Sequence, residues 1–234
     1  MLRDIISCVS LSLVAVTAFA QTGREWQDPE LNAVNREPAH AFFADYAPQR
    51  VVNVLPGREQ VVETSPWTLS LNGLWKFNWV NDLNQRPRTF FQEDFDDAGW
   101  VDFPVPALWE MNGYGDPVYT NVPYVWSRQF ANNPPFVEEK NNHVGSYRRT
   151  FDLPANWDGR DVFLHVGSAT SNLYVWVNGR FVGYSEDSKM GADFNITPYL
   201  KAGKNLIAMQ IYRWCDGTYL EDQDFWRLSG IGRN

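Results

Sequence analysis

Carboxylate side chains gather in two aromatic-rich stretches of this sequence, where they could form a catalytic pair, a cation site, a clamp for sugar hydroxyls or solvated turns. Residues 183–197 (GYSEDSKMGADFNIT) contain Glu186, Asp187 and Asp193. Residues 216–224 (DGTYLEDQD) contain Asp216, Glu221, Asp222 and Asp224. A catalytic pair would need two carboxyl groups facing one substrate, about 5–5.5 Å apart in retaining glycoside hydrolysis.

The placement of these acids argues against a catalytic pair. Glu186 and Asp187 are adjacent at the end of a predicted strand, so their side chains point to opposite faces. We interpret the acids of 216–224 as structural, because such clusters commonly hold turns and caps. From the residues alone, Asp187 is either a ligand or a strand-end cap. Asn121 is either a ligand or a turn residue in a Pro-rich loop.

The sequence contains no motif for several other kinds of functional site. The three histidines, His40, His143 and His165, lack short ligand spacing, and the sequence contains no phosphate-loop, dinucleotide or nucleophile-elbow motif. A site of oxygen ligands alone needs no fixed spacing and stays open. The net charge of −8, without a cluster of Lys or Arg, excludes a typical nucleic-acid partner.

The elements that must position these acids are predicted to be strands. Alternating apolar residues or short apolar runs between turn signals occur at residues 74–79, 147–153, 161–167, 172–185 and 205–214. Asn178-Gly179 predicts a tight hairpin, and Trp75, Phe77 and Trp79 share one strand face. Helical periodicity is absent. We therefore predict an all-β fold, an antiparallel jelly-roll β-sandwich, interrupted by a long non-periodic stretch at 104–143 that is typical of functional or covering loops.

Three regions are expected along the chain. Residues 1–20 resemble a secretory signal peptide cleaved after Ala20, which predicts a periplasmic or secreted protein without a membrane span. Residues 21–64 are predicted to form an extended N-terminal arm, and residues 65–234 the sandwich. Cleavage would remove Cys8 and leave Cys215 without an intramolecular disulfide partner.

Six blocks in order carry a resemblance to a known family. They are WQDPELNAVNREPAHAFF, SLNGLWKF, VPALWEMNGYGDPVYTNVPY, NPPFVEEKNNHVGSYRRTF, VNGRFVGYSEDSKMGADFNIT and RWCDGTYLEDQDFWRLSGI. Together they resemble the N-terminal, sugar-binding region of β-galactosidases of glycoside hydrolase family 2. The resemblance covers roughly residues 26–234, essentially the whole predicted mature chain.

The resemblance implies a multidomain enzyme of which this chain holds only the jelly roll, ending at the junction to a missing immunoglobulin-like domain. The catalytic glutamates would lie on an absent (β/α)₈ barrel, so the chain alone should be inactive. Asn121 would hydrogen-bond the galactoside, and Asp187 would bind galactose hydroxyls and a sodium ion shared with the barrel. Mg²⁺ is expected only in the full-length enzyme. β-Galactosides, the remaining domains and a homo-oligomer are the expected partners.

Two further interpretations stay open beside this fragment of a β-galactosidase. The aromatic surplus of the chain, 15% of its residues, fits a stand-alone carbohydrate-binding module without hydrolase activity. The arm at 21–64 would also fit a complementation-type piece that docks on the rest of an oligomer. The final residues, SGIGRN, depart from the family pattern at Gly232 and Asn234, which suggests a truncated gene, a frame-disturbed gene or an incomplete sequence.

Overall fold

The fold was analysed in a computed structural model, which describes residues 23–41, 65–221 and 224–233. The predicted signal peptide, residues 1–20, lies outside these ranges, as do residues 42–64 of the predicted arm. The boundary expected near residue 65 and the cleavage after Ala20 therefore stay predictions.

The described residues form strands joined by short 3₁₀ helices. The strands are β1 (Ala33–Val34), β2 (Gly73–Asp82), β3 (Val101–Val105), β4 (Ala107–Leu108), β5 (Val118–Thr120), β6 (Lys140–Asp152), β7 (Phe163–Val166), β8 (Ser168–Thr170), β9 (Leu173–Val177), β10 (Arg180–Ser185), β11 (Ala192–Asn195), β12 (Lys204–Tyr212), β13 (Phe225–Arg227) and β14 (Gly230–Arg233). The 3₁₀ helices are η1 (Glu25–Gln27), η2 (Leu83–Gln85), η3 (Glu110–Asn112), η4 (Val125–Arg128), η5 (Ala155–Trp157), η6 (Thr197–Tyr199) and η7 (Asp216–Tyr219). None of the described helices is long and apolar enough to cross a bilayer.

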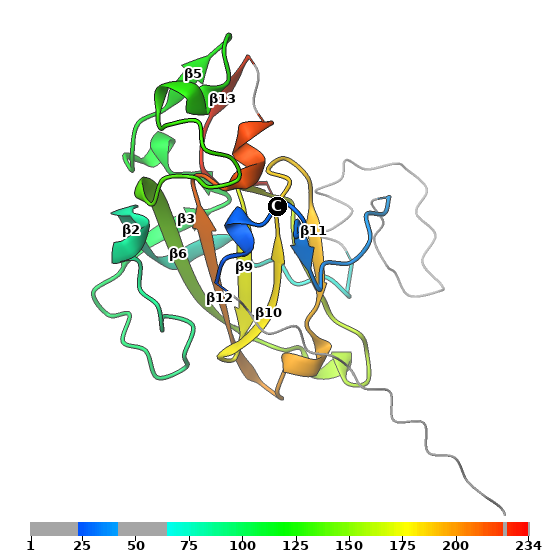
Figure 1. Ribbon diagram of the computed structural model, residues 1–234. Coiled ribbons are helices and arrows are strands. Elements are labelled where there is room, and N and C mark those ends of the chain that lie inside the picture. The colour runs from blue at the N-terminus through cyan, green and yellow to red at the C-terminus, as the bar shows by residue number, and fades with distance from the viewer. Residues whose placement is uncertain (1–22, 42–64, 222–223, 234) are drawn as a thin grey trace, which may run out of the picture.

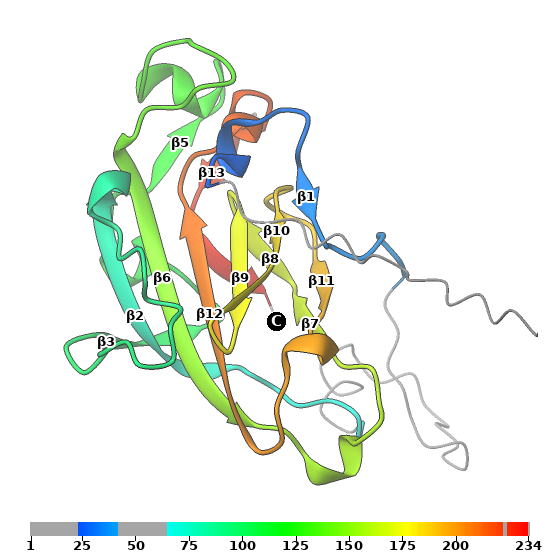
Figure 2. The same cartoon turned by 60° about the horizontal axis from the view of Figure 1, so that its bottom comes forward.

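One large sheet dominates the molecule, with strand order β1-β10-β9-β12-β6-β2-β3 (Figures 1 and 2). Smaller ladders, β11-β7, β13-β5 and β4-β14-β8, complete the fold. Every pairing among the described strands is antiparallel. The all-β, antiparallel part of the prediction is therefore confirmed.

Both faces of the large sheet are covered, because its central strands alternate between two apolar cores. Leu173, Val175 and Val177 of β9 enter the core shared with β7, β11, β8 and β14. Tyr174 and Trp176, on the opposite face of β9, enter a core closed by η1, η4, η7 and the connecting loops. This double burial explains why the segment reads as a continuous apolar run instead of a strict alternation.

The predicted hairpin lies at the stated position. Asn178 and Gly179 have φ values of 49° and 78°, the left-handed conformation that a two-residue turn of this kind requires at both positions. The Asn178 amide donates to the Tyr199 carbonyl at 2.9 Å, and its oxygen accepts from the Leu206 backbone N–H at 2.9 Å. The turn is therefore tied to the neighbouring β12 and to η6.

The non-periodic stretch at 104–143 carries short elements: β4, β5, η3, η4 and the start of β6. β5 pairs with β13, and Figure 1 shows this ladder at one end of the molecule, close to η7. The stretch thus builds an extension at one end of the sandwich. The earlier Asn72-Gly73 dipeptide leads directly into β2 and makes no hairpin.

The described part of the predicted arm packs against the large sheet. β1 pairs with β10 through Ala33↔Ser185 and Val34↔Tyr184. The carboxylate of Glu25, itself buried, accepts from the Tyr174 hydroxyl at 3.1 Å. The N-terminal segment thus places the end of β10, where the acidic stretch begins.

Candidate functional site

The loop that follows β10 is held by the N-terminal segment. The Arg36 guanidinium donates to the Ser185 hydroxyl at 2.9 Å and to the Glu186 carbonyl at 3.0 Å. The Glu186 backbone N–H donates to the Asn32 carbonyl at 2.9 Å. These contacts fix the backbone at the point where Glu186 and Asp187 leave the sheet.

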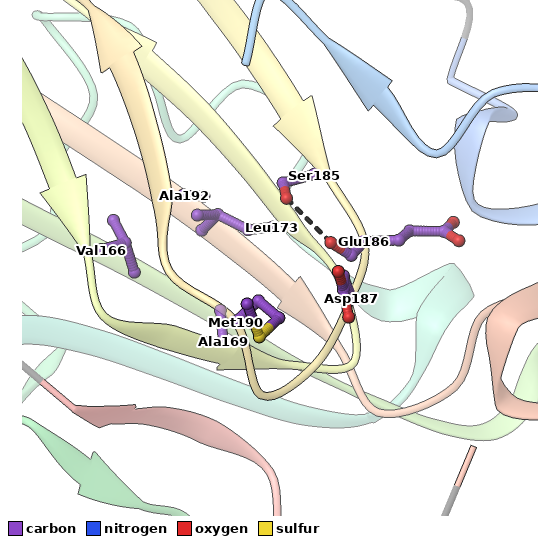
Figure 3. A pocket seen from close by; sticks show the side chains of 8 residues that line it. All are labelled: Val166, Ala169, Leu173, Ser185, Glu186, Asp187, Met190 and Ala192. Carbon is purple, nitrogen blue, oxygen red and sulfur yellow. Dashed lines mark hydrogen bonds between the residues drawn. The ribbon is translucent and has the colours of Figure 1, made fainter. Parts of the chain in front are cut away.

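Glu186 and Asp187 diverge, as strand alternation predicts. Figure 3 shows the Glu186 side chain extending away from that of Asp187, which lies at a small apolar pocket with Leu173 and Met190. Asp187 is exposed and has a φ of 88°, and its carbonyl accepts from the Met190 N–H at 3.0 Å to close a turn. The Asp187 carboxylate is therefore presented to solvent from a constrained backbone.

Glu186 instead enters a buried cluster with Asp216 and Cys215. Ligand atoms of these three side chains lie within 4.8 Å of one another, the one such group of three or more His, Cys, Asp or Glu residues in the described chain. The Tyr184 hydroxyl donates to Glu186 Oε1. Asp216 Oδ1 accepts from the Gly217 N–H at 2.8 Å.

Burial makes this cluster a proton-binding site. Desolvation, supported by the adjacent carboxylate of Asp216, raises the pKa of Glu186 to about 9. Desolvation also raises the pKa of Asp216, although a hydrogen bond from Glu186 opposes this. The raised pKa leaves the Glu186 carboxyl protonated at neutral pH, where it hydrogen-bonds Asp216.

The same cluster has two oxygen ligands for a cation. A hard cation between the Glu186 and Asp216 carboxylates would replace this proton and neutralise both charges. Burial raises the pKa of the Cys215 thiol well above its usual range, so Cys215 stays protonated and is a poor ligand. No local pattern indicates that Glu186 and Asp216 lie together, because 30 positions separate them in the sequence.

Glu221 connects the two acidic stretches. Its carboxylate accepts from the Ser188 hydroxyl at 2.7 Å and from the fully buried Arg227 at 3.1 Å. The turn after Asp187 is thereby fastened to the segment between η7 and β13. This contact agrees with the structural role predicted for Glu221; Asp222 lies outside the described residues.

Asp193 contacts two histidine side chains beside the β11-β7 ladder. It is the second residue of β11. Its carboxylate lies 2.9 Å from His165 Nδ1 and 3.4 Å from His40 Nε2. Two of the three histidines therefore flank one carboxylate.

Asn121 lies at the tip of the β5-β13 ladder. It is exposed, and its side-chain oxygen accepts from the Val122 backbone N–H at 2.9 Å. The ladder ends with the pair of Thr120 and Phe225, so Asn121 directly follows β5 and Asp224 directly precedes β13. The Tyr119 hydroxyl donates to Asp224 Oδ1 at 2.6 Å.

This ladder presents a polar and aromatic face. Tyr119 pairs with Trp226, their rings are 5.2 Å apart, and both rings are about half exposed. Tyr119 contacts both Trp226 and Asp224, and Asn121 directly follows β5; these four residues are here called the ladder-tip group. Amide and carboxylate oxygens beside flat aromatic rings are suited to binding a sugar.

The structure brings Asp224 against Tyr119, two residues before Asn121, and the turn that carries Asp187 lies near β13. The Lys189 ammonium, two residues beyond Asp187, lies 5.3 Å from the centre of the Phe225 ring in β13. Asp224 was expected to be a structural acid. Strands of only three residues give no periodic signal, so nothing in the sequence indicated that Asp224 contacts Tyr119.

Comparison with known proteins was made for the chain as a whole. Residues 68–234 match the family model "Glycosyl hydrolases family 2, sugar binding domain". The chain is 42% identical over 219 residues to the β-galactosidase of Priestia megaterium, covering 93% of this chain and 21% of that protein. It is 40% identical over 210 residues to the β-galactosidase of Halalkalibacterium halodurans, covering 89% of this chain and 20% of that protein.

A similar fold occurs in a solved structure, that of Bacteroides uniformis β-glucuronidase 2 covalently bound to cyclophellitol-6-carboxylate aziridine. The TM-score is 0.52 at 23% identity, covering 70% of this chain and 17% of the other. At this identity the likeness extends to the fold alone. The chain spans about a fifth of the length of the curated relatives that it matches.

Proposed function

The chain belongs to glycosyl hydrolases family 2, as its sugar-binding region, and we propose that it supplies the N-terminal part of the galactose pocket of a β-galactosidase. The identity of about two residues in five to proteins named β-galactosidase carries this proposal. Within it, this chain contributes binding. Hydrolysis of terminal β-D-galactosides, with retention, is assigned to two glutamates of a barrel outside residues 1–234.

Within the proposal, Asn121 and Asp187 bind the galactoside, and Asp187 also ligates a sodium ion. The exposed carboxylate of Asp187 supplies at most two oxygen ligands to a cation. The remaining ligands of the sodium ion would come from other parts of the enzyme. The geometry adds Asp224, which accepts from the Tyr119 hydroxyl at the same end of the ladder and can accept from sugar hydroxyls. Tyr119 and Trp226 offer ring faces for stacking.

A chimera tests this function. Residues 23–234 would replace the corresponding region of the Priestia megaterium β-galactosidase, and hydrolysis of a nitrophenyl β-galactoside would be measured. We expect an active chimera in which Asn121→Ala, Asp187→Asn or Asp224→Asn raises KM or lowers kcat/KM by roughly tenfold, as loss of a charge-assisted or buried hydrogen bond to substrate does. Asp94→Asn, which neutralises an exposed acid on another loop, is the matched control.

Two results would contradict the proposal. One is a folded chimera that hydrolyses a different β-glycoside but no β-galactoside. The other is full activity in all three site variants. For the sodium ligand, the Asp187→Asn chimera should lose the stimulation by Na⁺ over K⁺ that the unsubstituted chimera shows.

The second candidate is a stand-alone carbohydrate-binding module. The two apolar cores and the solvent-facing ladder-tip group favour it, because binding then needs no further domain. Calorimetric titration of the 234-residue chain with galactose and lactose separates the two functions. Binding that Asp224→Asn weakens supports the module, whereas an absence of heat together with an active chimera supports the half-site.

Two finer predictions accompany this function. We propose that the sandwich has jelly-roll connectivity, and that residues 1–20 direct the chain to the periplasm or the outside of the cell. Sequencing the N-terminus of the mature protein after expression in a bacterial host tests the second point. A mature chain that begins at Gln21 is the expected result.

A further inference from the structure

A groove separate from the ladder-tip group lies between the N-terminal segment and the loops around η2. It measures about 730 Å³, counting the space open to solvent. Trp26 and Leu83, both nearly fully buried, line its inner part. Arg24, Arg86, Arg88, Phe136 and Glu139 complete most of its lining.

The walls of this groove are fastened to one another. The Gln27 amide donates to the Val137 carbonyl at 3.0 Å, which joins η1 to the segment before β6. The Leu83 backbone N–H donates to the Glu139 carbonyl at 3.2 Å, which joins η2 to the same segment. The groove is therefore formed by connected backbone and is not a gap between separate loops.

Arg86 is held in a defined position. Its Nη1 donates to the Leu83 carbonyl at 2.7 Å, and its guanidinium lies 5.5 Å from the centre of the Tyr212 ring. No carboxylate in the described residues forms an ion pair with Arg86 or with the exposed Arg88. Arg86 also hydrogen-bonds Tyr212, and within the described part of the chain its other N–H groups and those of Arg88 are available to a ligand.

The ligand chemistry follows from these side chains. A guanidinium presents a planar fork that matches carboxylate and sulfate oxygens, and the two groups of Arg86 and Arg88 outnumber the single lining carboxylate of Glu139. The ring of Phe136 is 55% exposed at the rim, where it offers a flat face to a sugar ring. A neutral sugar would use the ring but leave the positive charges unmatched.

We propose that this groove binds an oxyanion-bearing carbohydrate, a sulfated or uronic-acid-containing oligosaccharide. Arg86 and Arg88 contact the anionic groups and Phe136 stacks on a sugar ring. This site goes beyond the proposed galactose pocket, since it uses none of the residues assigned there. It would allow the chain to hold a charged polysaccharide while a separate pocket takes a terminal galactose.

Calorimetric titration of the 234-residue chain tests the proposal. The probes are a sulfated galactan oligosaccharide, a galacturonate oligosaccharide, a neutral galacto-oligosaccharide of the same length, and inorganic sulfate. We expect at least one anionic oligosaccharide to bind, with an affinity that falls as salt is added. Whether the sulfated or the uronic ligand binds identifies the source of the charge.

Three variants locate the site. Arg86→Gln/Arg88→Gln should weaken binding by about tenfold or more, and Phe136→Ala by a smaller factor. Arg180→Gln/Lys204→Gln, which removes two positive charges elsewhere on the surface, is the matched control and should bind normally. Arg88→Gln alone, at an exposed position, guards against misfolding of the double variant, which unfolding midpoints would report.

Four results would overturn the proposal. The first is that neither anionic oligosaccharide binds, and the second is that the neutral oligosaccharide binds with the same affinity. The third is that inorganic sulfate binds as tightly as the sulfated glycan, and the fourth is that the groove and control variants lose the same affinity. The proposal stands apart from the galactosidase assignment, because an inactive chimera would not change any of these titrations.

Discussion

The protonated carboxyl of Glu186 makes a strong prediction about stability and pH. The pKa of Glu186 is raised from 4.5 to about 9, chiefly by desolvation. In the unfolded chain this carboxyl loses its proton near pH 4.5, whereas in the folded chain it keeps it to about pH 9. Between these values the folded state binds one more proton, so stability must fall as the pH rises.

The magnitude follows from linkage. Each pH unit in this window lowers the free energy of unfolding by about 1.4 kcal/mol, so the loss from pH 5 to pH 8 is on the order of 4 kcal/mol. Glu186→Gln mimics the protonated form: its amide oxygen can accept from Tyr184 and its NH₂ can donate to Asp216. The variant should therefore lack this part of the pH dependence and be more stable than the parent at pH 8.

The assay is urea unfolding followed by tryptophan fluorescence at pH 5, 6, 7 and 8, with a chelator present so that no cation replaces the proton. Glu138→Gln, an exposed change on the segment before β6, is the control and should follow the parent curve. Parallel curves for the parent and Glu186→Gln would refute the reasoning, since they would mean that Glu186 is ionised throughout this range.

Three further predictions concern the same framework. If the carboxylates of Glu186 and Asp216 bind a cation, Mg²⁺ should raise the unfolding midpoint of the parent at pH 8, without a chelator, more than that of Glu186→Gln. Equal shifts in the two proteins would contradict a cation site there. Gly145→Ala should lower the free energy of unfolding by about 3 kcal/mol in urea titrations, because the new Cβ would lie 2.4 Å from Cζ2 of the buried Trp109. An unchanged unfolding midpoint would show that the core rearranges around the added methyl group without cost. Gly183→Ala places a Cβ 2.4 Å from the Val34 carbonyl, so β1 should detach from β10. Hydrogen exchange of the Val34 amide should then become faster, while the amides of the central strands keep their protection. Slow exchange of the Val34 amide would contradict this prediction.

The large sheet could be predicted from local patterns, because the signals that define it lie within a few residues. Asn178-Gly179 marks its hairpin, and the alternation of Trp75, Phe77 and Trp79 on β2 places one face toward the core. Such features depend on turn conformation and strand periodicity, which the sequence displays directly. The strand β12, buried on both faces, was also recognisable as a short apolar run.

The site depended on contacts that no local pattern displays. Asp216 meets Glu186 across 30 positions of sequence, and Asp224 accepts a hydrogen bond from Tyr119 across 105. Both contacts depend on how η7 and the β5-β13 ladder close over the end of the sheet. The expectation that Glu186 and Asp187 point apart agrees with the structure, but both residues lie beyond the end of β10 and Asp187 has a φ of 88°, so the turn and not strand alternation sets their directions.

The two outer strands of the large sheet restrict how copies of this chain can associate. On one side, β1 contributes only two residues beyond β10, too short a template for another strand. On the other side, Pro104 interrupts the outer strand β3 with a residue that has no N–H to donate. Edge-to-edge growth of the sheet, the route to strand-swapped or amyloid-like aggregates, is therefore blocked at both ends of the sheet that the structure describes. An assembly of copies would have to use side-chain surfaces and leave the backbone of this sheet unextended.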